Sequence, residues 1–513
     1  MLEERKSTKI VKSFIVIALM STTFLFAFLG ITRSLRHDEC CSVEISNTSW
    51  AGILENLKVN AHTPPLYYFL LNLWMEPFGT SEAAVRGLSA LFYILSLGAV
   101  YQLGKTLYDR KTGLLAAFLF MVSPMAIWHA QDARMYSLLA LEAILSTYFF
   151  WQLFFFRAGS KAYLAAYVLI NVAGTFTHYW FFFVLLSQSV IFLFLLPRSW
   201  GRMMVAAFLS IFPFLAFGIP FLLIQLSNGG ISELSRPGPQ ALVSTLLTFY
   251  GGSKMGALFY GAFLALVLFE FSGLKPKLRD LSALKAFAGR RLTLAVLLWA
   301  LVSLLAPWII SQLKPVYVES RYTIIAVPAV ALLLGAFLSR YGARIPTLIF
   351  CSLLFAAVVL GFVHRRTNPL AVTFKSQSEY LLREIRAGDV LVLCTSSRAG
   401  LDYYLGRMNR DNQYAKISFP SEMSAHPCWT NMKKWLADMD YLEKDAGSTV
   451  EQIYTLARKD SARIWLISGH HPEIDRIIKL KLAARFSPAA TKVPSLFHNQ
   501  IAVYQKAAAQ VPL

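Results

Sequence analysis

The sequence predicts a polytopic α-helical membrane protein of about eleven transmembrane helices plus interfacial helices, followed by a small C-terminal extracytoplasmic α/β domain. The 513-residue chain is 56% hydrophobic and only 15% charged, with a mean hydropathy of +0.50, whereas soluble chains carry about 25% charged residues. Residues 364–513 carry 35 charges in 150 positions, against 43 in residues 1–363. We therefore expect a membrane part over 1–363, a soluble part over 364–513, and no ordinary soluble enzyme.

Apolar stretches of about the length that crosses a bilayer recur along the first part. The predicted spans are 14–31, 87–108, 113–130, 137–156, 162–180, 181–197, 203–226, 254–272, 292–310, 322–339 and 345–363. The apolar segment 65–78 is too short to cross and ends at proline and glycine. It is predicted as an interfacial or re-entrant helix.

The basic residues predict how the chain is oriented. Of the 28 Lys and Arg in residues 1–363, 19 fall in alternate loops that are cytoplasmic if the N-terminus is cytoplasmic. Eleven crossings then place the C-terminal domain outside, and the first span is expected to stay as an uncleaved anchor. Most of the +20 net charge is explained by topology and the outer domain, so no nucleic-acid partner is expected.

Polar residues gather at the predicted outer boundary of the membrane. The first outer loop, about 32–86, begins with Asp38 and Glu39 close to the exit of the first span. Other short outer connections place further polar side chains at similar depth, namely Gln131, Asp132, Arg134, Tyr136, His178, Tyr179, Glu319, Arg321 and Tyr322. Taken singly, such residues solvate helix ends or anchor the interface. Several at one level favour a shared site.

These residues stand in motifs that carry a resemblance. The Asp38-Glu39 pair after the first span is followed by HTPPLYYFLL, SPMAIWHAQDARMYSLL and, late in the chain, ESRYTIIAVPA. In this order and spacing, over about residues 14–340, the chain resembles glycosyltransferase family 39 of the GT-C superfamily. That group includes the protein O-mannosyltransferases and the lipid A aminoarabinose transferase.

The resemblance implies a glycosyltransferase. The donor would be a polyprenyl-phosphate sugar of the undecaprenyl type, and the acceptor a hydroxyl of a lipid, glycan or protein outside a bacterial-type inner (cytoplasmic) membrane. Asp38 would be the base, with Glu39 assisting, and the reaction would invert the anomeric centre. The implied partners of the donor phosphate are Arg134, Arg321, Tyr322 and Tyr136. No nucleotide-binding motif is present, which agrees with a lipid-linked donor.

Further substrate-proximal residues are expected at His62, Gln131, Asp132, His178, Tyr179 and Glu319. No cofactor is required. A divalent metal held by His62 and His178 stays open as an alternative, but the sequence does not support it because the two histidines show no ligand spacing. The chain also departs from the family. Thr63 precedes Pro64-Pro65, where the aminoarabinose transferases carry a lysine, so that sugar is in doubt. The Pro-Pro-Leu-Gly-Lys of the mannosyltransferases is absent too.

The tail is predicted to alternate helices and strands. An amphipathic helix, a turn at Gly388-Asp389 and a buried strand are followed by a helix in AGLDYYLGRM and a strand in ARIWLISGH. Capping the outer face and recognising an acceptor are both open as its role. Its net charge of +7 suits an anionic lipid or glycan surface.

The five cysteines leave the disulfide connectivity open. Cys351 lies in a predicted span, while Cys40, Cys41, Cys394 and Cys428 face an expected oxidising exterior. A bond from Cys40 or Cys41 to Cys428 would tie the first outer loop to the tail.

Two other classes of function compete with a transferase. A transporter or flippase of a lipid-linked sugar would place charged or broken helices near the bilayer midplane. In this sequence the polar groups gather at the outer boundary instead. A catalytically inactive scaffold is the third reading.

Overall fold

The computed structural model describes most of the chain. The described residues are 21–22, 25–60, 63–157, 159–197, 199–228, 235–272, 288–341, 344–367, 372–408, 414–428, 432–457, 461–469, 471–489, 491, 493–497 and 500–506. Of the predicted first span, 14–31, the structure describes residues 21–22 and 25–31, and residues 21–22 and 25–28 are helical.

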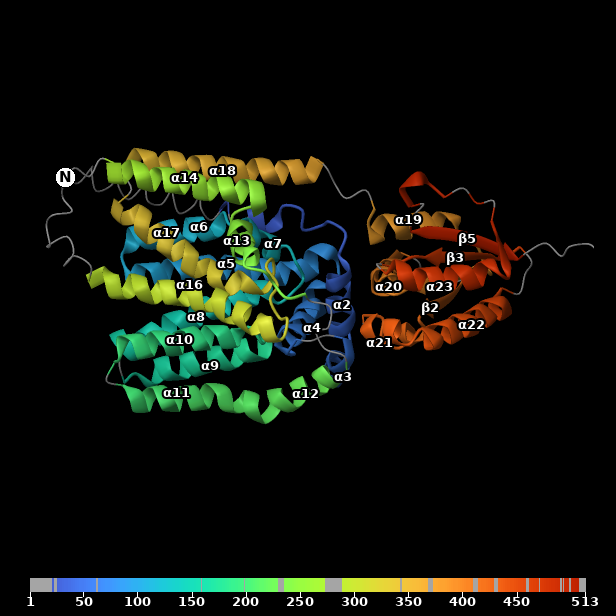
Figure 1. The fold of residues 1–513 in the computed structure, drawn as a ribbon, viewed down its shortest axis with the longest axis horizontal. Coiled ribbons are helices and arrows are strands. Elements are labelled where there is room, and N and C mark those ends of the chain that lie inside the picture. Colours follow the sequence, from blue (N-terminus) through green and yellow to red (C-terminus); the bar gives the residue numbers. More distant parts are fainter. Residues whose placement is uncertain are drawn as a thin grey trace, which may run out of the picture.

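The first part is a bundle of long helices that run alongside one another (Figure 1). The bundle helices are α5 (Glu82–Leu107), α6 (Arg110–Met121), α7 (Pro124–Ala130), α8 (Tyr136–Trp151), α9 (Lys161–Thr177), α10 (Phe181–Leu195), α11 (Trp200–Pro213), α12 (Ile219–Ser227), α13 (Gln240–Phe249), α14 (Gly252–Ser272), α16 (Ala288–Leu313), α17 (Val327–Tyr341) and α18 (Arg344–Thr367). Each predicted span from 87–108 onward coincides with one of these helices or with consecutive helices. The helix α13 lies in a region predicted as an outer loop.

Several bundle helices are apolar enough to cross a membrane. By length and composition, five helices in the described residues qualify, or six if the pair α6 and α7, bent by 64°, is one span. These segments differ in burial. In the apolar 18-residue stretch of Tyr136–Phe156, 78% of the residues are buried, whereas in that of Trp200–Ser227 only 17% are buried. The peripheral segment instead exposes large apolar side chains such as Met204, Phe208 and Phe217. Such an apolar outer surface suits lipid contact, and the protein is a multi-pass membrane protein.

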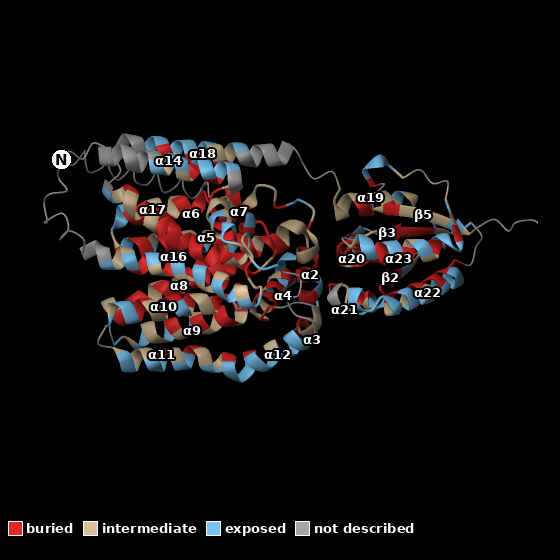
Figure 2. Ribbon diagram, in the orientation of Figure 1, coloured by how far each residue is buried: buried red, intermediate tan, exposed pale blue. Residues whose placement is uncertain are grey.

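The centre of the bundle is tightly packed. Figure 2 shows buried residues concentrated on α5, α6, α8 and α17, with exposed residues on the outer helices. Glycines allow this close approach, since a Cβ on Gly113 of α6 would lie 2.6 Å from the carbonyl oxygen of Tyr101 on α5. A Cβ on Gly335 of α17 would lie 2.9 Å from the backbone nitrogen of Ala116.

Three shorter helices lie at the end of the bundle nearest the C-terminal sheet: α2 (His37–Ser46), α3 (Trp50–Asn60) and α4 (Leu66–Phe78) (Figure 1). The start of α2 is fixed because the Glu39 side chain reaches back to accept a hydrogen bond from the N–H of Arg36, as in a capping box. The segment predicted as an interfacial or re-entrant helix forms α4, which packs against α2 and α5. At this end of the bundle, α2 contacts α20 (Ser397–Met408), a helix of the C-terminal part.

The C-terminal part is a small sheet with helices on it. Its strands β1 (Val390–Cys394), β2 (Ala415–Phe419), β3 (Arg463–Ile467), β4 (Phe486–Pro488) and β5 (Ile501–Lys506) stand in the order β2-β1-β3-β5-β4. Its helices are α19 (Phe374–Glu384), α20 (Ser397–Met408), α21 (Met432–Ala437), α22 (Met439–Leu456) and α23 (Pro472–Ala483). The inner strand β1 pairs in parallel with β2 and with the central strand β3, and β5 runs antiparallel to β3. The predicted helices and strands of the tail therefore form, with the turn at Gly388 in a left-handed conformation (φ 91°).

Direct hydrogen bonds join the two parts. The hydroxyl of Tyr404 on α20 accepts from the backbone N–H of Leu35 at 2.8 Å. The hydroxyl of Tyr403 donates to the carbonyl of Thr80 at 2.6 Å. Lys375 lies 3.4 Å from the carboxylate of Glu82. The C-terminal part is thus docked on α2 and the start of α5, where the candidate site lies.

Candidate active site

The carboxylate of Asp38 lies at the start of α2 and faces a cation from a distant part of the chain. Its Oδ2 accepts a hydrogen bond from Arg321 Nη1 at 2.8 Å. Both side chains keep about two fifths of their surface exposed, 36% for Asp38 and 42% for Arg321. Burial by itself would raise the pKa of Asp38, but the charges of Arg134 and Arg321 outweigh it and hold that pKa below the usual range. Asp38 is therefore ionised at neutral pH, with one face open to a reactant.

Arg134 approaches the same helix from the connection between α7 and α8. Its Nη1 donates to Ser42 Oγ at 3.2 Å, to the Tyr68 hydroxyl at 3.4 Å and to the Asp38 carbonyl at 3.4 Å. Its Nε is buried and has no hydrogen-bond partner among the described residues. The site thus combines one carboxylate with two guanidinium groups, one of which has unused donor capacity.

Glu39 has a different environment from its neighbour. It is fully buried and forms a bidentate ion pair with Arg86, through Nε at 2.7 Å and Nη2 at 2.8 Å. Its oxygens also accept from the backbone N–H groups of Ala133 and Arg36. With its oxygens occupied in this way, Glu39 joins α2, α5 and the Arg134 connection and holds Asp38 in place.

Asp132 and Gln131, two other predicted site residues in the connection between α7 and α8, have their polar groups bound to other residues of the protein. The buried carboxylate of Asp132 lies 2.7 Å from Arg36 Nη2 and 3.7 Å from His129 Nδ1. Burial would raise its pKa, but His129 and Arg36 hold the pKa well below its usual range. Gln131 donates to the carbonyl of Phe26 at 2.6 Å. Both residues position the connection that carries Arg134.

A cluster of aromatic side chains adjoins the charged groups. The ring centroid of Tyr322 lies 4.7 Å from His178, 6.0 Å from Tyr136 and 5.3 Å from Trp180. The guanidinium of Arg134 lies 6.0 Å from the centroid of Tyr136. His178 accepts the N–H of Trp180 on Nδ1 at 3.1 Å, so in its neutral form Nε2 carries the proton. That Nε2 is buried without a hydrogen-bond partner among the described residues.

Not every predicted residue belongs to this cluster. The hydroxyl of Tyr179 donates to Gln225 of α12 at 2.6 Å, and that amide in turn donates to the carbonyls of Leu57 and Thr63. Tyr179 is therefore part of a structural contact between α12 and the α3–α4 region. The carbonyl of Glu319 accepts from Thr323 at 2.6 Å. His62 lies outside the described residues.

Sequence reasoning missed three residues that the fold brings to the site. Arg86 on α5, Ser42 on α2 and Tyr68 on α4 contact Glu39 or Arg134. Arg86 had a detectable signal, because a lone arginine near the start of an apolar helix needs a buried partner. Ser42 had a weaker one, since it stands one helical turn after Asp38. Tyr68 stands among other aromatic residues and had none.

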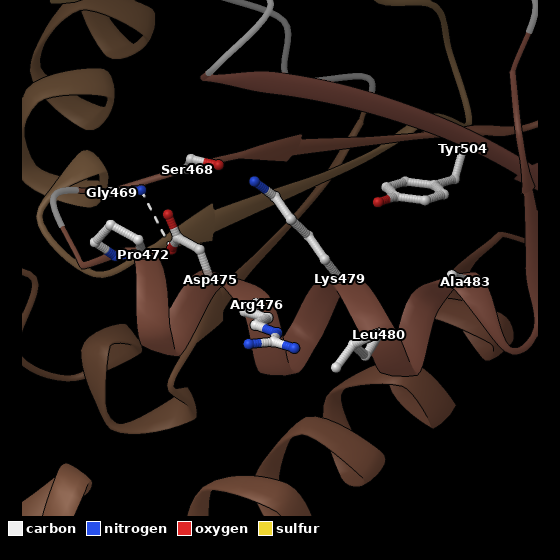
Figure 3. Close-up of a pocket in the computed structure, with 9 residues that line it drawn as sticks. All are labelled: Ser468, Gly469, Pro472, Asp475, Arg476, Lys479, Leu480, Ala483 and Tyr504. Atoms are coloured by element: carbon white, nitrogen blue, oxygen red, sulfur yellow. Dashed lines mark hydrogen bonds between the residues drawn. The ribbon is translucent and has the colours of Figure 1, made fainter.

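The C-terminal part contains a separate pocket of about 440 Å³ (Figure 3). It is lined by Ser468 and Gly469 after β3, by residues of α23, and by Tyr504 on β5. Figure 3 shows the Lys479 side chain extending from α23 toward Ser468, with Asp475 beside it. All of its lining residues belong to the C-terminal part, so this pocket is separate from the site at Asp38.

The described residues hold no cluster of three or more His, Cys, Asp or Glu side chains suited to a metal ion. All five cysteines are described, and all are free thiols. The disulfide expected as one alternative between the first outer loop and the tail is not formed in this structure.

Comparisons with known proteins agree with the arrangement of the bundle. Residues 62–225 match the family model of the dolichyl-phosphate-mannose-protein mannosyltransferases. This match includes Arg134 and His178 but neither Asp38 nor Arg321. No curated protein matches the chain by sequence.

Solved structures resemble this chain over nearly its whole length. ArnT from Cupriavidus metallidurans in the apo state superimposes with a TM-score of 0.62 at 12% identity, covering 96% of this chain and 98% of that one. ArnT from the same organism bound to undecaprenyl phosphate gives a TM-score of 0.58 at 14% identity, with 97% and 99% covered. The likeness extends over the bundle and the C-terminal sheet together.

Proposed function

This chain has the fold of the GT-C superfamily of membrane glycosyltransferases, and we propose that it transfers a monosaccharide from a polyprenyl-phosphate-linked donor to an acceptor hydroxyl. The observation that carries the proposal is that two arginines meet Asp38 at one end of an apolar bundle: Arg321 contacts its carboxylate and Arg134 its backbone carbonyl. ArnT, which shares the fold, is known in complex with undecaprenyl phosphate. That lipid phosphate is the class of leaving group that two arginines would bind.

The proposed reaction is a single displacement at the anomeric carbon. Asp38 takes the proton of the acceptor hydroxyl as the hydroxyl oxygen bonds to the anomeric carbon. The bond from that carbon to the phosphate oxygen breaks, and the electron pair leaves on the polyprenyl phosphate with inversion of configuration. Arg134 and Arg321 stabilise the added negative charge. The step as proposed needs no cofactor, because no nucleotide has to be held.

Arg321 is the residue that links the base to the phosphate. A guanidinium binds carboxylates and phosphates with similar geometry, so the Arg321 that lies 2.8 Å from Asp38 can turn to the donor phosphate. This exchange would leave Asp38 with one fewer cation beside it and make it a stronger base at the moment when the donor is in place.

The aromatic cluster is proposed to receive the sugar and phosphate of the donor. Tyr136 and Tyr322 present hydroxyl groups beside the arginines, and His178 presents an unpartnered Nε2. Glu39 is proposed as a positioning residue, because its bidentate pair with Arg86 occupies it. Of the other predicted substrate-proximal residues, Gln131, Asp132 and Tyr179 are proposed to support the site through the contacts described above.

We place the site on the outer face of a bacterial-type inner membrane, with the N-terminus cytoplasmic and the C-terminal part outside, as the basic loops predict. The acceptor is a lipid, glycan or protein on that side. The C-terminal part is proposed to cap the site, because its hydrogen bonds join it to residues next to Asp38 on α2 and α5.

The proposal is tested by incubating the purified protein with labelled polyprenyl-phosphate sugars and separating free polyprenyl phosphate from donor. Asp38→Asn should keep the fold and lose activity by about 10²–10⁴-fold, the usual contribution of a general base. The exposed Asp440→Asn on α22 is the matched control and should keep full activity. Full activity of Asp38→Asn would overturn the assignment of the base.

The same experiment separates a transferase from a transporter or flippase of a lipid-linked sugar. A transporter moves the donor without breaking its sugar-phosphate bond. It would therefore release no polyprenyl phosphate, whichever donor is tested. In reconstituted vesicles, donor translocation without release would support the transporter and reject the transferase.

A further inference from the structure

Two cysteines from distant parts of the chain meet beside the candidate site. Cys41 stands on α2, three residues after Asp38, and Cys428 follows β2 in the C-terminal part. Their side chains are hydrogen-bonded to each other. Both are buried, with 7% and 8% of their surface exposed, and both belong to the hydrophobic cluster that includes residues of α2 and α20.

The geometry of α2 selects Cys41 over its neighbour. Consecutive residues of a helix point about 100° apart, so only one of two adjacent cysteines can face a given partner. Cys40 lies instead near Glu39 and Arg86, beside Tyr403 and Tyr404 of α20. The two candidates that sequence reasoning could not separate are therefore distinguished by their direction on the helix.

A histidine one turn earlier on α2 faces the selected thiol. The Nε2 of His37 lies 3.6 Å from Cys41 Sγ. Although burial opposes both charges, the mutual attraction raises the pKa of His37 to about 9 and, with the hydrogen bond from Cys428, lowers the pKa of Cys41 to about 6. The charge of His37 thus favours the thiolate form of Cys41, the form that attacks disulfides.

We propose that Cys41 and Cys428 form a disulfide that joins α2 covalently to the C-terminal part. The proposal rests on the outer location of this part in the proposed function, because disulfides form in oxidising compartments. The oxidant is the disulfide of an extracytoplasmic thiol oxidase, which acts while the two parts are coming together and the thiols are still accessible.

The step is a thiol-disulfide exchange that balances. The Cys41 thiolate attacks one sulfur of the oxidase disulfide and releases the other as a thiolate, which leaves a mixed disulfide. Cys428, losing its proton, then attacks the Cys41 sulfur and expels the second oxidase thiolate. Starting from the Cys41 thiolate, the cysteine pair loses two electrons and one proton, that of Cys428, and the oxidase gains them as one thiol and one thiolate.

The bond would fix the helix that carries the proposed base. Asp38 lies one helical turn before Cys41, so a covalent link at Cys41 would limit movement of the first turn of α2 relative to the C-terminal part.

The test is mass mapping of the full-length protein, purified without reductant after its free thiols have been alkylated. A peptide pair joined through Cys41 and Cys428 is expected from the wild type and from the matched control Cys40→Ser. The pair should be lost from Cys41→Ser and Cys428→Ser.

Alkylated Cys41 and Cys428 in the wild type would overturn the proposal, as would a bond from Cys40 to Cys428 or between Cys40 and Cys41. The wild-type result decides even if a variant fails to fold. It is also separate from the donor assay: an active transferase with free thiols rejects only the disulfide, and an inactive protein with the bond rejects only the transferase.

Discussion

At the scale of single residues, the adjacent acidic side chains of Asp38 and Glu39 differ in burial and in their partners. Asp38 is partly exposed and paired with one partly exposed arginine, whereas Glu39 is fully buried and held by Arg86 from two sides. Their directions on α2 differ by about 100°, which turns one toward the site and the other into the core. Only the exposed carboxylate is placed to meet a reactant.

The pairing of Asp38 with Arg321 predicts the pH dependence of the reaction. Because the pKa of Asp38 is depressed, the base is ionised at neutral pH and activity falls only as the pH drops through a value below about 3.9, the usual aspartate pKa. Arg321→Gln removes one of the charges that depress it, so the acid limb of kcat/KM should move to higher pH.

The measurement is kcat/KM against pH, which reports the free enzyme, with the exposed Lys314→Gln as control. Lys314→Gln should keep the wild-type profile, because Lys314 is exposed and is not one of the charges that shift the pKa of Asp38. An acid limb that does not move in Arg321→Gln would show that Arg321 does not act on the ionisation of Asp38.

At the scale of elements, the position of the site depends on close helix packing. A Cβ on Gly104 of α5 would lie 2.8 Å from the Cα of Gly113 on α6, so the two backbones are in contact. Without a hydrophobic driving force in lipid, membrane helices associate through such small residues. Because α5 carries Arg86 and α6 leads through α7 to Arg134, their packing sets the distance between these arginines.

Enlarging Gly113 should separate these helices. Gly113→Ala places a methyl group 2.6 Å from the Tyr101 carbonyl and is expected to destabilise the protein by about 1–3 kcal/mol, the usual cost of overpacking. The control is Gly98→Ala on the exposed face of α5, where a Cβ meets nothing within 4 Å. Thermal unfolding in detergent compares the two variants. Equal melting temperatures would contradict the role of this contact.

At the scale of the whole molecule, the C-terminal part is hydrogen-bonded to the end of the bundle that holds the site. Tyr404 connects it to the segment before α2 by accepting from Leu35, and Lys375 connects it to the start of α5. The pocket at Lys479 lies in the same part but is lined only by its own residues. Capping through Tyr404 and acceptor recognition at this pocket are two separate hypotheses for the C-terminal part, and because they invoke different side chains they can be tested apart.

If the C-terminal part acts as a cap, Tyr404→Phe should weaken its docking and Lys479→Ala should not. The first variant leaves the buried N–H of Leu35 without its acceptor, at a cost of about 1–3 kcal/mol. Faster hydrogen exchange at Leu35 and lower activity are expected from Tyr404→Phe, with unchanged kinetics from Lys479→Ala. A raised KM for the acceptor in Lys479→Ala would favour acceptor recognition at the pocket instead.

Much of the architecture could be predicted because it follows from local sequence. Apolar stretches of about 20 residues cannot remain in water and must form helices in lipid, and each predicted span after the first coincides with helical structure. The tail's strand at Val390–Cys394 and helix at Ser397–Met408 follow from short-range patterns too. The helix α13 was missed, because its ten residues are too few to stand out from an apolar loop.

The sequence predicted many residues of the candidate site but not the contacts between them. The sequence by itself determined a membrane protein with a helical bundle, a small α/β tail and polar side chains at one boundary, since burial and hydrogen bonding of the backbone depend on local composition. Only the tertiary structure decided that Asp38 meets Arg321 across 283 positions, that Glu39 is held by Arg86, and that Cys41 rather than Cys40 faces Cys428. The physical reason is that such pairs depend on the rotation of each helix about its axis and on its packing, which the sequence of one helix alone does not specify.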